Sequence, residues 1–141
     1  MGAMALWMQI SSGSETPIYL QLVEQISSAI AKGELRTGDK LPAVRVLAAE
    51  LVINPNTVAR AYTILEQSGL VTTKTGSGTY VSDPKLRHAD AAEINLLAER
   101  MDTLITRAVN LGLDRGALTA LFEKRLERFA GRLDKGKAEN G

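Results

Sequence analysis

The chain has 141 residues, with 17 Lys and Arg against 16 Asp and Glu, one His and no Cys. This length fits one domain, or one domain with a small appendage, and an apolar fraction of 45% is normal for a folded globular chain. Without Cys there is no disulfide scaffold or thiolate zinc site. With His88 alone there is no multi-histidine metal site, so we expect no cofactor. The formal net charge of only +1 argues at first sight against a nucleic-acid-binding protein.

The N-terminal residues carry no targeting signal. They lack the basic start and small-residue cleavage site of a signal peptide, and no apolar run approaches the roughly 20 residues of a membrane span. We therefore expect a cytoplasmic protein without membrane contact. Met1-Gly2-Ala3-Met4 has the pattern of an expression scar, and Ser11-Ser12-Gly13-Ser14 is typical of a flexible segment. Residues 1–13 are thus predicted to be a flexible tail.

The first helix is predicted to begin near Thr16-Pro17, with Thr16 as N-cap and Pro17 in the first turn. Gly33 is a natural stop. The apolar residues of this helix recur at helical spacing and form one stripe. They are Ile18, Leu22, Val23, Ile26 and Ile30.

Two short helices follow a connector over residues 35–42. The first is predicted over Ala43–Leu51. The second begins at Pro55, with Asn54 as N-cap, and stops at Gly69. Two short helices joined by a tight turn are typical of a helix-turn-helix.

Two β-like runs, Leu70–Thr73 and Thr79–Val81, flank a Gly-containing loop and predict a hairpin. Three helices followed by a hairpin make a winged helix-turn-helix, which we assign to residues 14–83. A Gly-x-Gly loop can also cradle phosphate, but a dinucleotide loop should open a helix, whereas strand-like residues lie on both sides here. A plain turn is the other reading of this loop.

After Ser82-Asp83-Pro84, residues 84–141 are predicted to form a helical hairpin with a frayed tail from Asp134. The fold class is therefore α+β and mostly helical. The apolar stripes of the hairpin are too wide for two helices to cover, which indicates dimerisation. The residues expected at the dimer contact are Leu97, Met101, Leu104, Ile105, Leu118, Leu121, Phe122, Leu126 and Phe129. For the charges of the second helix we expect a solvated face with i,i+4 ion pairs. These charges are Lys124, Arg125, Arg128 and Arg132 with Glu123 and Glu127.

The second helix of a helix-turn-helix lies in the DNA major groove, and its N-terminal residues meet bases and phosphates. Asn pairs with adenine in two places, Thr contacts a thymine methyl, and the helix N-terminus favours phosphate. In the alternative reading, Asn54 is only a helix cap and each Arg is only a solvated surface residue. The predicted DNA-contacting residues are Arg45, Asn54, Pro55, Asn56, Thr57 and Arg60, with Lys74, Thr75, Gly76, Ser77 and Gly78 of the hairpin loop.

Several short motifs together resemble the GntR family of bacterial transcription regulators, in register over residues 16–82. They are Pro17-Ile18-Tyr19, Gly38-Asp39-Lys40-Leu41-Pro42, Asn54-Pro55-Asn56-Thr57-Val58, Ala61-Tyr62 and Gly76-Ser77-Gly78-Thr79-Tyr80-Val81. The short two-helix C-terminal part is similar to the YtrA subfamily. The resemblance implies a homodimer on a palindromic operator, with Gly76 at the wing tip in the minor groove. It also implies a repressor, often of a transporter operon.

The chain departs from the family pattern at three places. Ala43 stands where Ser is common, and Thr75 stands where Arg or His often precedes the wing Gly. Val52-Ile53 replaces a more usual Gly-Val, which we expect to change the turn slightly without abolishing it.

The expected partners are a double-stranded DNA operator and a second copy of the chain. The sequence leaves open whether a small-molecule effector also binds. An alternative function is a winged-helix module for protein–protein contact. An enzyme is not indicated, because no paired carboxylates or activated nucleophile are evident. Cations exceed acids by two within residues 36–81, where Arg36, Lys40, Arg45, Arg60 and Lys74 accompany Asp39, Glu50 and Glu66.

Overall fold

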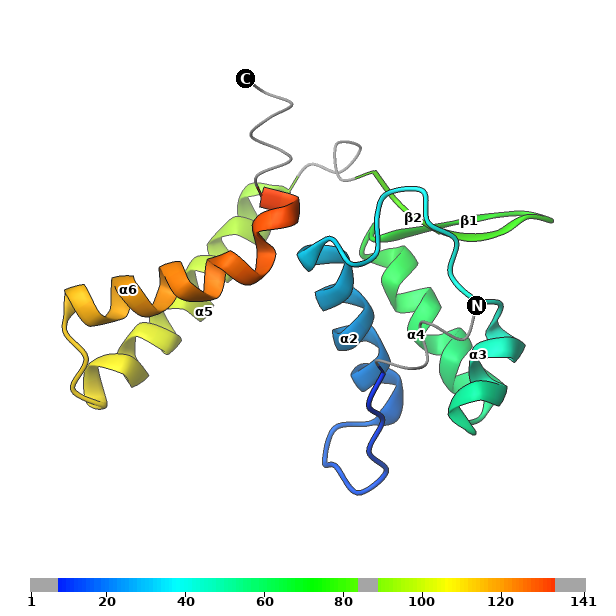
Figure 1. Ribbon diagram of the computed structural model, residues 1–141, viewed down its shortest axis with the longest axis horizontal. Helices are drawn as coiled ribbons and strands as arrows, with labels where there is room; N and C mark the ends of the chain where they lie inside the picture. Colours follow the sequence, from blue (N-terminus) through cyan, green and yellow to red (C-terminus); the bar gives the residue numbers. More distant parts are fainter. Residues whose placement is uncertain (1–7, 84–88, 134–141) are drawn as a thin grey trace. The chain divides into compact units, whose positions relative to one another are not determined.

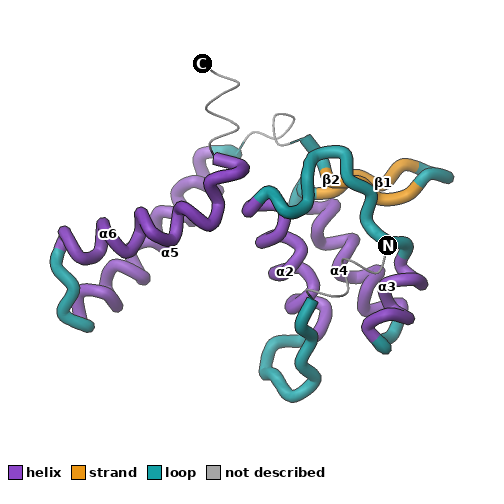
Figure 2. Tube along the Cα trace, in the orientation of Figure 1, coloured by secondary structure: helices purple, strands orange, loops and turns teal. Residues whose placement is uncertain are grey.

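The computed structural model describes residues 8–83 and 89–133. The chain divides into two compact units, Met1–Leu86 and Arg87–Gly141, each taken by itself below (Figure 1). The described residues of the first unit form three helices and a two-stranded hairpin, and those of the second unit are helical (Figure 2). The predicted α+β, mostly helical winged helix-turn-helix with a C-terminal helical region is confirmed. His88, residues 1–7 of the predicted tail and the predicted frayed tail lie outside the described residues.

The first unit is built on α2 (Ile18–Lys32), α3 (Val44–Leu51) and α4 (Pro55–Gln67). Helix α4 packs against both other helices and against the first strand. Each helix contributes its apolar stripe to one core, and burial of a Leu, Ile or Val side chain is worth about 1.5–3 kcal/mol. The core consists of Met8, Leu22, Ile26, Ile30, Leu41, Leu47, Ala48, Val58, Ala61, Tyr62, Leu65, Val71 and Val81.

The wing is an antiparallel hairpin of β1 (Val71–Lys74) and β2 (Gly78–Val81), in which Val71 pairs with Val81 and Lys74 pairs with Gly78. The strands therefore lie within about one residue of the predicted runs. The predicted connector also pairs with β2, since Leu41 N donates to Thr79 O at 2.8 Å and Val81 N donates to Asp39 O at 2.8 Å. Strand β2 is thus hydrogen-bonded on both edges.

Two predictions at the start of this unit are wrong. Pro17, and not Thr16, occupies the N-cap of α2, without a side-chain cap bond. Residues 8–11 of the predicted flexible tail are packed on α2. Met8 is buried, and the Gln21 side chain accepts from Ser11 N through Oε1 and donates to Ser11 O through Nε2, each at 2.8 Å. The side-chain amide of Gln21 contains both a donor and an acceptor. It therefore pairs with the backbone of Ser11 as a neighbouring β-strand would, and it fixes residues 8–11 on α2.

The second unit contains α5 (Ala91–Asn110) and α6 (Arg115–Leu126). Asp90 and Asp114 cap these helices by accepting from Glu93 N and Ala117 N, each at 2.8 Å. The turn that the predicted hairpin requires follows α5, with Gly112 at φ 91°. The second helix of the predicted hairpin is interrupted after α6 by a 3-10 turn, η2 (Glu127–Phe129). Within the described residues, no helix is long and apolar enough to cross a membrane.

The helix-turn-helix turn is made by Val52, whose backbone is left-handed at φ 55° and ψ 52°. The predicted turn is therefore kept without Gly. Its amide reaches back to Ala49 O at 3.3 Å, and the next amide, of Ile53, donates to Ala48 O at 3.0 Å. A β-branched residue is strained in this conformation, and the Val52 side chain is 88% exposed, so packing offers it little compensation.

Val52→Gly is accordingly expected to stabilise the protein. Relief of about 1–2 kcal/mol of left-handed strain exceeds the roughly 0.5–1 kcal/mol of chain entropy that Gly adds to the unfolded state. Urea denaturation should show a net gain of several tenths of a kcal/mol or more. The matched control is Ala49→Gly, an exposed helical site, where a loss of about 1 kcal/mol is expected. Equal losses in both variants would contradict the strain at Val52.

Candidate nucleic-acid interface

The N-terminus of α4 is arranged as the sequence predicts. The Asn54 side-chain oxygen accepts from Asn56 N at 2.8 Å, and Pro55 occupies the first turn. Asn54, Pro55 and Asn56 are exposed, whereas Thr57 is half-buried. The capping interpretation of Asn54 is therefore correct, and its amide nitrogen remains available for a base or phosphate. The Asn56 side chain is exposed as well, and it makes no cap bond of its own.

The exposed face of α4 follows from its buried face. Val58, Ala61, Tyr62 and Leu65 are buried, so the 3.6-residue period turns the opposite positions outward. The exposed stripe consists of Asn56, Arg60, Thr63 and Gln67, at i, i+4, i+7 and i+11. The sequence prediction included Asn56 and Arg60 but missed Thr63 and Gln67, although the period of the buried residues locates them.

Arg60 is exposed, and its guanidinium carbon lies 3.8 Å from the centroid of the Tyr19 ring. Tyr19 is half-buried and comes from the first turn of α2. This contact is a cation–π stack between two helices. The sequence predicted Arg60 and gave no role at the interface to Tyr19, because the two residues are far apart along the chain.

Arg45 lies in the first turn of α3 and is exposed. The start of this helix is tied to α4 by the Tyr62 hydroxyl, which donates to Pro42 O at 2.7 Å. Burial raises the pKa of Tyr62 well above its ordinary value, so the hydroxyl remains protonated and keeps donating. Tyr62 therefore lies in the core with its hydroxyl at the edge, where the hydroxyl is hydrogen-bonded to Pro42.

The loop between β1 and β2 is exposed from Lys74 to Ser77. Ser77 N donates to Lys74 O at 2.9 Å, which closes the turn, and Gly76 has a φ of 77°. A Cβ on Gly76 would meet nothing within 4 Å, so the tip of the turn is open to solvent. Tyr80 organises the loop: its hydroxyl is hydrogen-bonded to Ser77 Oγ, and Lys74 Nζ lies 4.9 Å from its ring centroid.

Lys40 is a wing cation that the sequence prediction missed. It forms a β-bridge to Tyr80, and a Cβ built on Gly78 would lie 2.7 Å from Lys40 Cε. The lysine stem therefore lies over Gly78, which has a φ of 135°. Because Gly78 pairs with Lys74, the structure places two lysine side chains beside one residue of β2. No local signal in the connector indicates this pairing.

The exposed residues of α3, α4 and the wing together offer amide groups, a hydroxyl, arginines and lysines. Within residues 8–83 and 89–133, no group of three or more His, Asp or Glu side chains is placed to hold a metal ion. Amide and guanidinium groups on the exposed face of a helix can read base edges. Lysines on a Gly-rich hairpin can contact phosphates or a minor groove.

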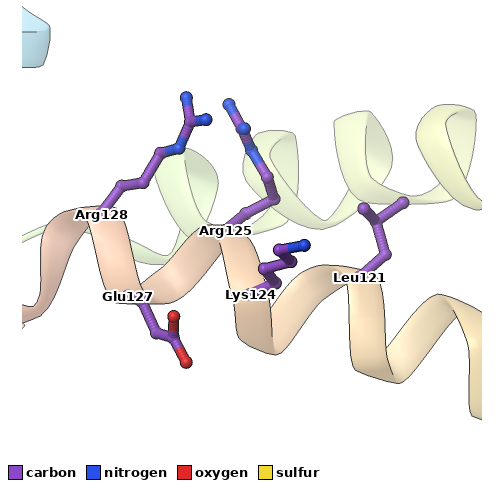
Figure 3. A pocket seen from close by; sticks show the side chains of 5 residues that line it. All are labelled: Leu121, Lys124, Arg125, Glu127 and Arg128. Atoms are coloured by element: carbon purple, nitrogen blue, oxygen red, sulfur yellow. The ribbon is translucent and has the colours of Figure 1, made fainter.

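The charges of the α6 region are arranged differently from the prediction. An open depression of about 490 Å³ is lined by Leu121, Lys124, Arg125, Glu127 and Arg128. Figure 3 shows the Arg125 and Arg128 side chains rising on one side of the helix while Glu127 points to the other. The expected i,i+4 ion pairs are wrong, since Lys124 and Arg128 at that spacing are both cations and Glu123 and Glu127 are both acids.

Comparison with known proteins agrees with this geometry. The family model "Bacterial regulatory proteins, gntR family" matches residues 18–81. The HTH-type transcriptional repressor YtrA of Bacillus subtilis (strain 168) is 39% identical over 106 residues, which span 75% of this chain and 82% of that relative.

Two solved structures are similar over most of the chain. A transcriptional antiterminator from Listeria monocytogenes EGD-e is 28% identical with a TM-score of 0.71, over 83% of this chain and 87% of that one. YtrA from Sulfolobus acidocaldarius, a GntR-family transcription factor, is 33% identical with a TM-score of 0.52, over 84% and 96% of the two chains. With its winged helix-turn-helix and short helical C-terminal part, this chain belongs to the GntR family of bacterial transcription regulators, in its YtrA-like branch.

Proposed function

We propose that the protein is a homodimeric repressor that binds a palindromic DNA operator and occludes a promoter until a signal releases it. The observation that carries this proposal is the exposed stripe of α4, in which Asn56 and Arg60 stand in line on a helix whose opposite face is buried. Such a helix fits the major groove, as in other helix-turn-helix proteins. The Bacillus subtilis relative is a transcriptional repressor by name, which supports repression as the direction of regulation.

The predicted DNA contacts divide into two classes. Asn54, Asn56, Thr57 and Arg60 on α4 are suited to base edges, and Arg45 on α3 is suited to the backbone or a base. The wing loop from Lys74 to Gly78, to which we add Lys40, is suited to phosphates and the minor groove. The YtrA-like membership favours a transporter operon as the regulated target.

A band-shift assay against the region upstream of its own operon tests specific binding. Arg45→Ala and Arg60→Ala are expected to weaken binding to that duplex by about 1–3 kcal/mol each, because each removes a charged donor. The matched control is Arg100→Ala, which removes an exposed cation from α5. Circular dichroism checks that each variant is folded. Binding to the upstream region that never exceeds binding to random duplex would contradict the proposal.

Lys40→Gln and Lys74→Gln are expected to weaken binding to all duplexes by a similar factor. The affinity falls as salt rises, and each change should make this dependence shallower. The slope of log affinity against log salt should decrease in magnitude by about 1, because binding through each lysine would release about one counterion. Lys124→Gln on α6 is the control for loss of an exposed cation outside the wing. An unchanged salt slope in both wing variants would remove these lysines from the interface.

We place the proposed dimer contact in the second unit, because most apolar side chains of α5 and α6 are exposed in the single chain. Ala108 is the one buried side chain of α5, and α6 has none. Of the predicted contact residues, Leu118, Leu126 and Phe129 are half-buried. The remainder are 42–63% exposed: Leu97, Met101, Leu104, Ile105, Leu121 and Phe122. An apolar surface of this extent on a small helical unit favours a second copy as its cover.

Sedimentation velocity at micromolar concentration is expected to show a dimer. Leu104→Asp should shift the protein to monomer, because it would place a charge in the apolar contact. Thr103→Asp, at the neighbouring exposed position of α5, should leave the dimer intact. A monomeric wild-type protein would overturn this part of the proposal.

A further inference from the structure

The stack between Tyr19 and Arg60 joins the exposed face of α4 to the first turn of α2. Tyr19 packs against the hydrophobic core from its half-buried position, so its ring is held by the body of the unit. Arg60 has no such support of its own, since it is exposed. The separation of 3.8 Å between the guanidinium carbon and the ring centroid is well within the roughly 6 Å range of a cation–π interaction.

The ring stacks on the flat face of the guanidinium and leaves the edges of the group free to donate hydrogen bonds. The N–H donors of Arg lie in the plane of the group, so a ring beneath that plane does not compete with them. Within residues 8–83, Arg60 has no hydrogen bond or ion pair. The group is therefore fixed in place while its donors remain unused, which is the state required for two-point recognition of guanine or phosphate.

An arginine that is already held loses less freedom when it binds. Arg carries a large side-chain entropy, and immobilising such a side chain at an interface lowers affinity. If the ring removes part of that freedom in the free protein, a smaller loss remains at the moment of binding. The neighbours of Arg60 in the stripe, Asn56 and Thr63, are short and need no such support.

We propose that Tyr19 is a positioning residue for DNA recognition, whose ring holds Arg60 on the exposed face of α4 with its donors free. This inference rests on the proposed function. It assigns to α2, which supplies no predicted DNA contact, a part in the affinity for the operator. The hydroxyl of Tyr19 has no role in it, so the ring alone should suffice.

A double-mutant cycle tests the proposal on the full chain, by fluorescence anisotropy with a duplex selected from a random pool and with a random duplex. Tyr19→Phe keeps the ring and should bind the selected duplex as the wild type does. Tyr19→Leu keeps apolar bulk without the ring and should bind it about two- to fivefold more weakly, the ratio expected for an exposed cation–π pair. In the Arg60→Ala background, Tyr19→Leu should cause no further loss.

A measurement on the free protein separates positioning from folding. The ring current of Tyr19 should shift the NMR signal of the Arg60 Nε–H group upfield, and this shift should persist in Tyr19→Phe and vanish in Tyr19→Leu. The corresponding Arg45 signal, from α3, should stay unchanged. If Tyr19→Leu loses its cooperative thermal transition, Tyr19→Met supplies a second ring-free apolar variant.

The outcomes are distinct. A wild-type protein that does not distinguish the selected duplex from the random one contradicts the proposed function itself. If the wild type does distinguish them, three results overturn the role of Tyr19 alone. These are wild-type affinity in the ring-free variant, an equal loss in Tyr19→Phe, and an undiminished loss from Tyr19→Leu in the Arg60→Ala background.

Discussion

The burial of one face of α4 is the constraint on which the rest of the winged unit depends. Val58, Ala61 and Leu65 have no exposed surface, and α4 packs against α2, α3 and β1. Removing any of these contacts would expose apolar surface in the centre of a small core. Once that face is buried, the helical period leaves Asn56 and Arg60 on the outside, so stability and the candidate recognition surface are set by the same packing.

A hydrogen bond, a backbone turn and a cation–π stack give this packing defined positions. The bond from the Tyr62 hydroxyl to Pro42 O fixes the start of α3 relative to α4, and the strained turn at Val52 closes the other end of α3. The stack of Arg60 on Tyr19 acts on the outer face of α4. The ring belongs to α2 and packs against the core from a half-buried position, so a residue of one helix contacts an exposed side chain of another.

The charge of +1 for the whole chain conceals an uneven distribution. Lys40 and Lys74 lie at the wing, with Lys40 held over Gly78, and Arg45 and Arg60 are exposed on α3 and α4. Outside residues 36–81 the remaining 12 Lys and Arg and 13 Asp and Glu nearly balance. At the end of α6 and in η2, the side chains of Arg125 and Arg128 rise on one side of the helix while Glu127 points to the other (Figure 3). A small net charge is therefore compatible with DNA binding, and it favours recognition through shape and base contacts over general attraction.

The sequence by itself determined the order of elements, the cap at Asn54, the buried stripes and the left-handed stop at Gly33, because these depend on spacing and on local backbone preference. It also located Asn56 and Arg60 at the candidate interface. Only the tertiary structure decided that residues 38–41 pair with β2, that Lys40 lies at the wing, that residues 8–11 pack on α2, and that Tyr19 meets Arg60. Each of these joins segments distant along the chain, and no periodicity or local propensity encodes which distant groups a folded core brings together.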